Sequence, residues 1–250
     1  MTTVAAFGRR YLPRGWGDFG RQLVIWLGFG FAYQIARGLA DRNPARAFEN
    51  GLKVIDFESR THALFEISLQ RLMDSPGLLT LFANWTYWLS QFTVVGLALL
   101  WVYFRHNDSF VRFRNLLLLT NVLGLVGYVL TPTAPPRMFP SFGFTDTLEV
   151  YGSIKHESGL VQLAANPYAA MPSLHAADAL IVGITLAVLV RRWPLKLVWL
   201  LWPAWVWFCV MATGNHYWLD VAGGIVVAAI AACVIYHLPL RRKQQPAPAG

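Results

Sequence analysis

Long apolar runs alternate with short charged segments along the chain. A helix needs about 20 mostly apolar residues to cross a bilayer, because roughly 30 Å of hydrocarbon is crossed at 1.5 Å per residue. The candidate spans lie within residues 21–36, 75–104, 115–131, 172–190, 195–213 and 217–236. The pattern predicts an all-α, polytopic membrane protein with six transmembrane helices.

The segments between these runs differ in character. Residues 41–74 mix charges of both signs with regularly spaced apolar residues, which predicts one or two amphipathic helices after the first span. We expect them to lie in the membrane interface, the alternative being a solvated helix that caps the bundle. Residues 138–170 are too polar to span, and we expect a long outer loop that covers the end of the bundle.

The composition supports a membrane protein. Apolar residues make up 56% of the 250 residues and charged residues 14%, a balance unlike that of soluble domains. The net charge of +8 does not indicate a nucleic-acid partner, because the Lys and Arg residues lie mainly at the ends of apolar runs. Cys209 and Cys233 fall inside predicted spans, so neither a disulfide framework nor a thiolate metal site is expected.

The basic residues predict how the chain is oriented. One face carries the N-terminal region, the turn marked by Arg105, Arg112 and Arg114, the turn at Arg191 and the basic cluster 241–243, which places both termini in the cytoplasm. The first outer loop, which begins with Arg37, is also basic and is an exception to this rule. We expect a plasma (inner) membrane protein with a single membrane-embedded domain, 1–243, and a disordered tail, 244–250.

Two histidine motifs lie at the predicted outer surface. Residues 171–175 read MPSLH at the start of the fourth span, and residues 216–220 read HYWLD at the start of the sixth. His175, His216 and Asp220 are therefore expected to meet at the open end of a hairpin. The four-residue spacing places His216 and Asp220 on one helix face, where a carboxylate fixes the tautomer of an imidazole.

Two further residues suit a phosphate group. Ser173 stands at a predicted helix start, where it either caps the helix or donates to a phosphate oxygen. Arg137 follows the proline-rich segment 132–136 and offers a planar, bidentate donor. These groups are what phosphoryl transfer through a covalent histidine requires. One imidazole attacks phosphorus, a second protonates the leaving oxygen, and fixed donors hold the remaining oxygens.

The segments PTAPPR (132–137), MPSLH and HYWLD together resemble the motifs of the type 2 phosphatidic acid phosphatase superfamily. The resemblance is closer to its inositol phosphorylceramide synthase-like (inositolphosphotransferase) branch, in which Pro-Ser-Leu-His replaces Pro-Ser-Gly-His. It implies that His216 is the nucleophile, Asp220 its orienting partner and His175 the general acid. It also implies that Arg137 and Ser173 bind phosphate and that the enzyme needs no metal or other cofactor.

Two cations of the superfamily motifs are absent. The positions that usually carry them, seven before the arginine of the first motif and six before the nucleophile, are Leu130 and Val210 here. Either Lys155 or His156 of the outer loop compensates, or the substrate is a phosphodiester, which carries less charge than a monoester. The second possibility favours head-group transfer over phosphatase action.

The expected function is lipid phosphatase or phosphotransferase action at the outer leaflet through a phosphohistidine. We favour transfer of an inositol phosphate-like head group from a phospholipid to a lipid or sugar alcohol. The alternative is a phosphatase of phosphatidic acid or polyprenyl phosphates, with water as the acceptor. Two other interpretations remain open. One is a lipid transporter without chemistry, and the other is a metal site formed by His175, Asp178, His216 and Asp220.

Overall fold

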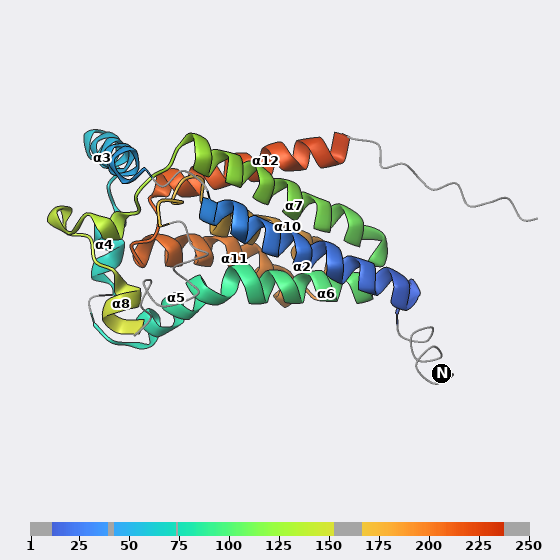
Figure 1. Ribbon diagram of the computed structural model, residues 1–250. Coiled ribbons are helices and arrows are strands. Elements are labelled where there is room, and N and C mark those ends of the chain that lie inside the picture. Colours follow the sequence, from blue (N-terminus) through green and yellow to red (C-terminus); the bar gives the residue numbers. More distant parts are fainter. Residues whose placement is uncertain (1–11, 40–42, 74, 153–166, 238–250) are drawn as a thin grey trace, which may run out of the picture.

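The computed structural model describes residues 12–39, 43–73, 75–152 and 167–237, most of which are helical. Long helices run alongside one another in Figure 1. They are α2 (Gly15–Leu39), the continuous unit of α5 (Leu78–Leu89), η1 (Ser90–Val94) and α6 (Val95–Arg105), α7 (Asn107–Leu130), α10 (Leu174–Leu189), α11 (Trp193–Ala212) and α12 (Trp218–His237). The all-α prediction is confirmed for the described residues.

Four helices of the described chain are long and apolar enough to cross a membrane. They are the unit Leu78–Arg105, α7, α11 and α12, which correspond to the predicted second, third, fifth and sixth spans. The predicted fourth span is α10, an apolar helix of 16 residues, and the first is α2, a helix of 25 residues that is not among the four. The chain is thus a multi-pass membrane protein, and the count of six spans stays a prediction.

Helix α10 lies at the centre of the bundle. It contacts α7, α11, α12 and the α5–α6 unit. Its buried residues are distributed around the whole helix, as expected for an apolar helix in a protein interior. Helix α12 approaches it closely at Gly224, where an added Cβ would lie 2.2 Å from the carbonyl oxygen of Ser173. This contact brings the two histidine motifs to the same end of the bundle.

Helix α7 begins earlier than the sequence suggested. Arg112 and Arg114 were expected in a cytoplasmic turn before a span that starts at residue 115, but both lie within α7. That prediction is wrong because an apolar run marks the membrane-crossing part of a helix and not its ends. The guanidinium group of Arg114 donates to the side chains of Gln22 and Asn115, and the bond to Gln22 joins the charged start of the helix to α2.

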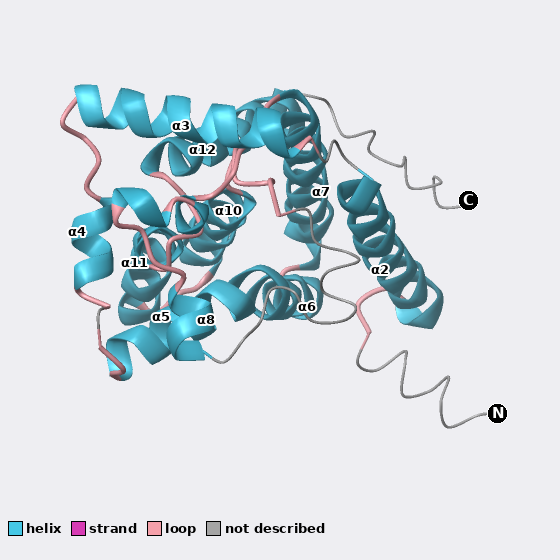
Figure 2. Ribbon diagram, turned by 60° about the vertical axis from the view of Figure 1, so that its left-hand side comes forward, coloured by secondary structure: helices cyan, strands magenta, loops and turns pink. Residues whose placement is uncertain are grey.

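Three shorter helices gather at the end of the bundle where the histidine motifs lie (Figures 1 and 2). They are α3 (Pro44–Arg60), α4 (Glu66–Arg71) and α8 (Thr147–Gly152). Helix α3 buries one face, formed by Ala47, Gly51, Val54, Ile55 and Glu58, so the predicted amphipathic helix is confirmed. Lys155 and His156 of the predicted outer loop, and the predicted tail 244–250, lie outside the described residues.

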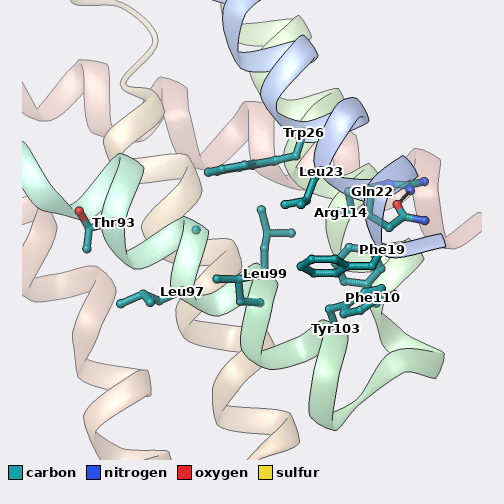
Figure 3. A pocket seen from close by; sticks show the side chains of 12 residues that line it. Phe19, Gln22, Leu23, Trp26, Thr93, Leu97, Leu99, Tyr103, Phe110 and Arg114 are labelled. Carbon is teal, nitrogen blue, oxygen red and sulfur yellow. Dashed lines mark hydrogen bonds between the residues drawn. The ribbon is translucent and has the colours of Figure 1, made fainter. Parts of the chain in front are cut away.

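A cavity of about 280 Å³ lies between the first half of α2 and helices α6 and α7, and Figure 3 shows its lining. The lining is mostly apolar, and its polar members include Gln22, Thr93 and Arg114. It contains neither of the motif histidines, and α2 contacts the bundle mainly through α7. At its start α2 also touches α6, where the ring of Phe19 packs on Tyr103 with 5.5 Å between centroids.

Candidate active site

The turn between α11 and α12 fixes the position of His216. Gly214 has a φ of +74°, and an added Cβ would lie 2.5 Å from the carbonyl oxygen of Thr145, so the turn requires glycine. The next two backbone N–H groups, those of Asn215 and His216, both donate to the carbonyl oxygen of Val210 at 3.1 Å. His216 is therefore held, 4% exposed, directly before α12.

The two histidine motifs are joined by direct hydrogen bonds. The backbone N–H of Ser173 donates to the carbonyl oxygen of Asp220 at 2.8 Å. The Nδ1 atom of His216 lies 3.0 Å from the carbonyl oxygen of Ala170. The imidazole rings of His175 and His216 come within 5.7 Å of each other, centroid to centroid. The predicted meeting of His175, His216 and Asp220 is thus present in the structure.

The surroundings of His216 select its tautomer. Nδ1 faces two acceptors, the carbonyl oxygen of Ala170 at 3.0 Å and Oδ2 of Asp220 at 3.4 Å. This oxygen of Asp220 also accepts the backbone N–H of Tyr217 at 2.9 Å, which fixes the carboxylate. Because both neighbours accept, the proton belongs on Nδ1 and the lone pair on Nε2.

The protonation state of His216 is set mainly by its burial. Burial lowers the pKa of His216 to about 3, and the charges of Arg137 and Arg37 act in the same direction, while the hydrogen bond to Ala170 opposes them. The imidazole is therefore neutral near pH 7. A neutral ring with its lone pair on Nε2 is the form that a nucleophile needs.

His175 lies in the first turn of α10 and is held by an aromatic neighbour. The ring of Tyr87 stacks on its imidazole, with 4.6 Å between centroids and 19° between planes. Ser173 caps the same helix, since its Oγ accepts the backbone N–H of Ala176 at 3.3 Å. The capping prediction for Ser173 is confirmed, and its role as a phosphate ligand stays a prediction.

Arg137 reaches the site from the segment after α7. Its backbone N–H donates to the carbonyl oxygen of Gly214 at 2.8 Å, and its Nη1 donates to Oδ1 of Asn215 at 2.6 Å. Its Nε lies 3.4 Å from Oδ2 of Asp146, and the side chain is 11% exposed. The guanidinium group is thus fixed next to the turn that carries His216.

A cavity of about 40 Å³ brings these groups together. His175, His216 and Arg137 line it, whereas Asp220 and Ser173 are not among its lining residues. The lining also includes side chains that sequence reasoning missed, namely Arg37, Tyr87, Gln91, Tyr128 and Asn215. Gln91 lies in η1, a π-helical turn, and such turns are frequent at functional sites.

Asp178 does not join the histidines. Its Oδ1 accepts Nδ2 of Asn121 at 3.0 Å, on the neighbouring helix α7. Within the described residues no group of three or more His, Cys, Asp or Glu side chains is placed to hold a metal ion. The metal-site interpretation therefore gains no support, and metal independence stays a prediction.

Comparison with known proteins agrees with this arrangement. A family model described as the PAP2 superfamily matches residues 52–234, which is more than half of the chain. The chain belongs to the PAP2 superfamily, the family of membrane phosphatases and phosphotransferases that its motifs resemble. No solved structure matches it.

The chain is also similar to the phosphoinositol dihydroceramide synthase of Bacteroides thetaiotaomicron. The two are 28% identical over 157 residues, which cover 57% of this chain and 50% of that protein. The match thus spans half the length of this relative. Together with the family, it agrees with the resemblance to the inositol phosphorylceramide synthase-like branch.

Proposed function

We propose that the protein transfers a phospho-head group from a membrane phospholipid to a lipid alcohol, with His216 as the nucleophile. The observation that carries the proposal is the pair of imidazoles, 5.7 Å apart, that lines one buried cavity with Arg137. The similar synthase supports inositol phosphate as the group and a ceramide-type alcohol as the acceptor.

In the first half of the reaction, Nε2 of His216 attacks the phosphorus atom of the donor lipid. The bond between phosphorus and the diacylglycerol oxygen breaks, and protonated His175 gives its proton to that oxygen. Arg137 holds a non-bridging oxygen as charge builds on it. Asp220 and the Ala170 carbonyl stabilise the positive charge that develops on the His216 ring.

In the second half, the acceptor hydroxyl gives its proton to His175 and attacks the same phosphorus atom. The bond between phosphorus and Nε2 breaks, and His216 returns to its neutral form. Water would release the head-group phosphate instead. The burial of His216 disfavours that side reaction, because a closed site excludes water. The scheme needs no metal.

The test compares purified wild-type protein with a His216→Ala variant in detergent and chelator. Phosphatidylinositol is supplied with or without a ceramide, and free phosphate, free inositol phosphate and new lipids are followed by mass spectrometry. The matched control is His237→Ala, at the exposed far end of α12. We expect a new inositol-containing lipid that depends on His216 and ceramide. Equal turnover by His216→Ala would refute the proposal, and release of phosphate from lipid phosphates would identify a phosphatase.

We further propose six membrane-crossing helices, with the histidine end facing the extracytoplasmic side. The basic residues Arg21, Arg105 and Arg191 lie near the helix ends opposite the cavity, which supports this orientation. A cysteine introduced at Ser141 should react with an impermeant reagent added to intact cells, and one introduced at Arg192 should not. The reverse labelling would overturn the orientation.

A further inference from the structure

Arg37 lies in the last turn of α2 and lines the same cavity as the two histidines. A cation is favoured at this end of a helix. Its guanidinium carbon lies 6.0 Å from the ring centroid of Tyr128, a cation–π contact. The positive charge of Arg37 therefore lies at the end of the bundle that carries the histidines, although α2 is far from the histidine motifs in the sequence.

One nitrogen of the Arg37 guanidinium group lacks a hydrogen-bond partner among the described residues. This atom, Nε, is buried. No carboxylate lines the cavity in the described residues, and Arg137 has an acidic neighbour in Asp146 whereas Arg37 has no ion pair there. Arg37 as a whole is half-buried, but a buried N–H group without an acceptor is costly, so an anionic ligand that accepts from Nε would offset its desolvation.

We propose that Arg37 is a phosphate-binding residue that forms a two-arginine clamp with Arg137 around the transferring group. This inference rests on the proposed function for the identity of the substrate. The superfamily usually has a cation at the positions of Leu130 and Val210, and neither residue lines the cavity. Val210 is fully buried elsewhere, and Leu130 is 62% exposed. Arg37 supplies the missing charge from a different helix.

The charges match a phosphodiester. A bound phosphodiester carries one negative charge, and the five-coordinate arrangement formed by nucleophilic attack carries a second on its equatorial oxygens. One arginine balances the single negative charge of the bound phosphodiester. The second arginine balances the additional negative charge that develops as the bond to His216 forms. Such differential stabilisation speeds the chemical step.

The test measures binding of inorganic phosphate, followed by the thermal unfolding temperature of the purified protein in detergent. Hydrogen bonds to charged groups contribute enough that we expect Arg37→Gln to weaken phosphate binding by about 10- to 100-fold. Arg37→Lys, which retains the charge, should recover part of the affinity and serves where Arg37→Gln is unstable. The matched control is Arg21→Gln, an exposed arginine that pairs with Asp18 on the same helix, and it should bind phosphate as the wild type does.

Lipid turnover is measured in parallel on the same variants. Arg37-dependent phosphate binding without any lipid turnover would support the clamp and refute the proposed function. His216-dependent turnover with unchanged phosphate affinity in Arg37→Gln would overturn the clamp and leave the proposed function standing. Absence of phosphate binding by the wild type would also overturn the clamp.

Discussion

Two buried glutamates predict how the stability of the protein depends on pH. Glu66 Oε1 accepts the backbone N–H of Trp218 at 2.6 Å, and Glu58 Oε1 accepts that of Leu219 at 3.3 Å. These N–H groups belong to the first turn of α12, where no intrahelical partner exists. Both glutamates are fully buried, so α3 and α4 together cap the helix that begins beside His216.

Both carboxyl groups hold a proton unusually well. Burial raises the pKa of Glu58 to about 9, helped by the negative charges of Glu66 and Asp220. Burial likewise raises the pKa of Glu66 to about 7. Because the unfolded chain releases these protons near pH 4.5, the folded state binds more protons above that pH. Stability should therefore fall as the pH rises through the folded pKa values.

The variant Glu58→Gln tests this expectation, because its amide oxygen can still accept the backbone N–H of Leu219 but the side chain cannot ionise. Between pH 7 and pH 9, where Glu58 loses its proton in the folded state, the wild type should lose about 2 to 3 kcal/mol of stability. For a chain of this size that is a fall of about 5 to 10 °C in Tm. The buried neutral state of His216 affects stability only at lower pH, below its unfolded pKa of 6.5.

The assay is thermal unfolding in detergent, followed by tryptophan fluorescence at several pH values. Glu58→Gln should remove the fall in Tm attributed to Glu58. The matched control is Glu49→Gln on the same helix, whose carboxylate is exposed and pairs with Lys53, and it should retain the wild-type slope. A Glu58→Gln variant with the wild-type slope would refute the claim that this carboxyl group holds its proton at neutral pH.

Two further substitutions test the geometry of the site. Gly214→Ala should lower Tm and should reduce turnover at least tenfold, because the added methyl group meets the Thr145 carbonyl oxygen at 2.5 Å in a left-handed turn. Normal turnover would show that the turn adapts. Tyr87→Leu should lower kcat by about 2- to 10-fold with little change in KM, because it removes the ring stacked on His175. A change confined to KM would instead place Tyr87 in lipid binding.

The sequence predicted the parts of the site that local spacing controls. His216 and Asp220 are four residues apart, and a helix start places them within 3.4 Å. Ser173 precedes an apolar run and caps it. Such features depend on a few neighbouring residues, so a single sequence reveals them.

Other features depend on how distant segments pack, and these were missed. Glu58 and Glu66 lie among alternating charges, where a solvated face is the ordinary expectation, and nothing local shows that they reach α12. Asn215 stands next to the proposed nucleophile His216, yet the structure shows its contact with Arg137, which lies 78 residues away in the sequence. Arg37 begins the predicted basic outer loop, which is an exception to the rule that basic residues lie on the cytoplasmic side. This exception was the only indication in the sequence that Arg37 has a role other than topology.

The proposed reacting groups and the proposed second phosphate-binding charge come from different parts of the chain. The histidines, Asp220 and Arg137 fall within residues 52–234, the part that the superfamily model matches, and Arg37 precedes it. The proposed nucleophile, the proposed acid and one proposed phosphate donor thus come from the shared region, whereas the proposed second positive charge comes from α2. Because that charge decides how much negative charge the cavity accommodates, a change in α2 can alter the preferred phosphate ester while the reacting groups stay in place.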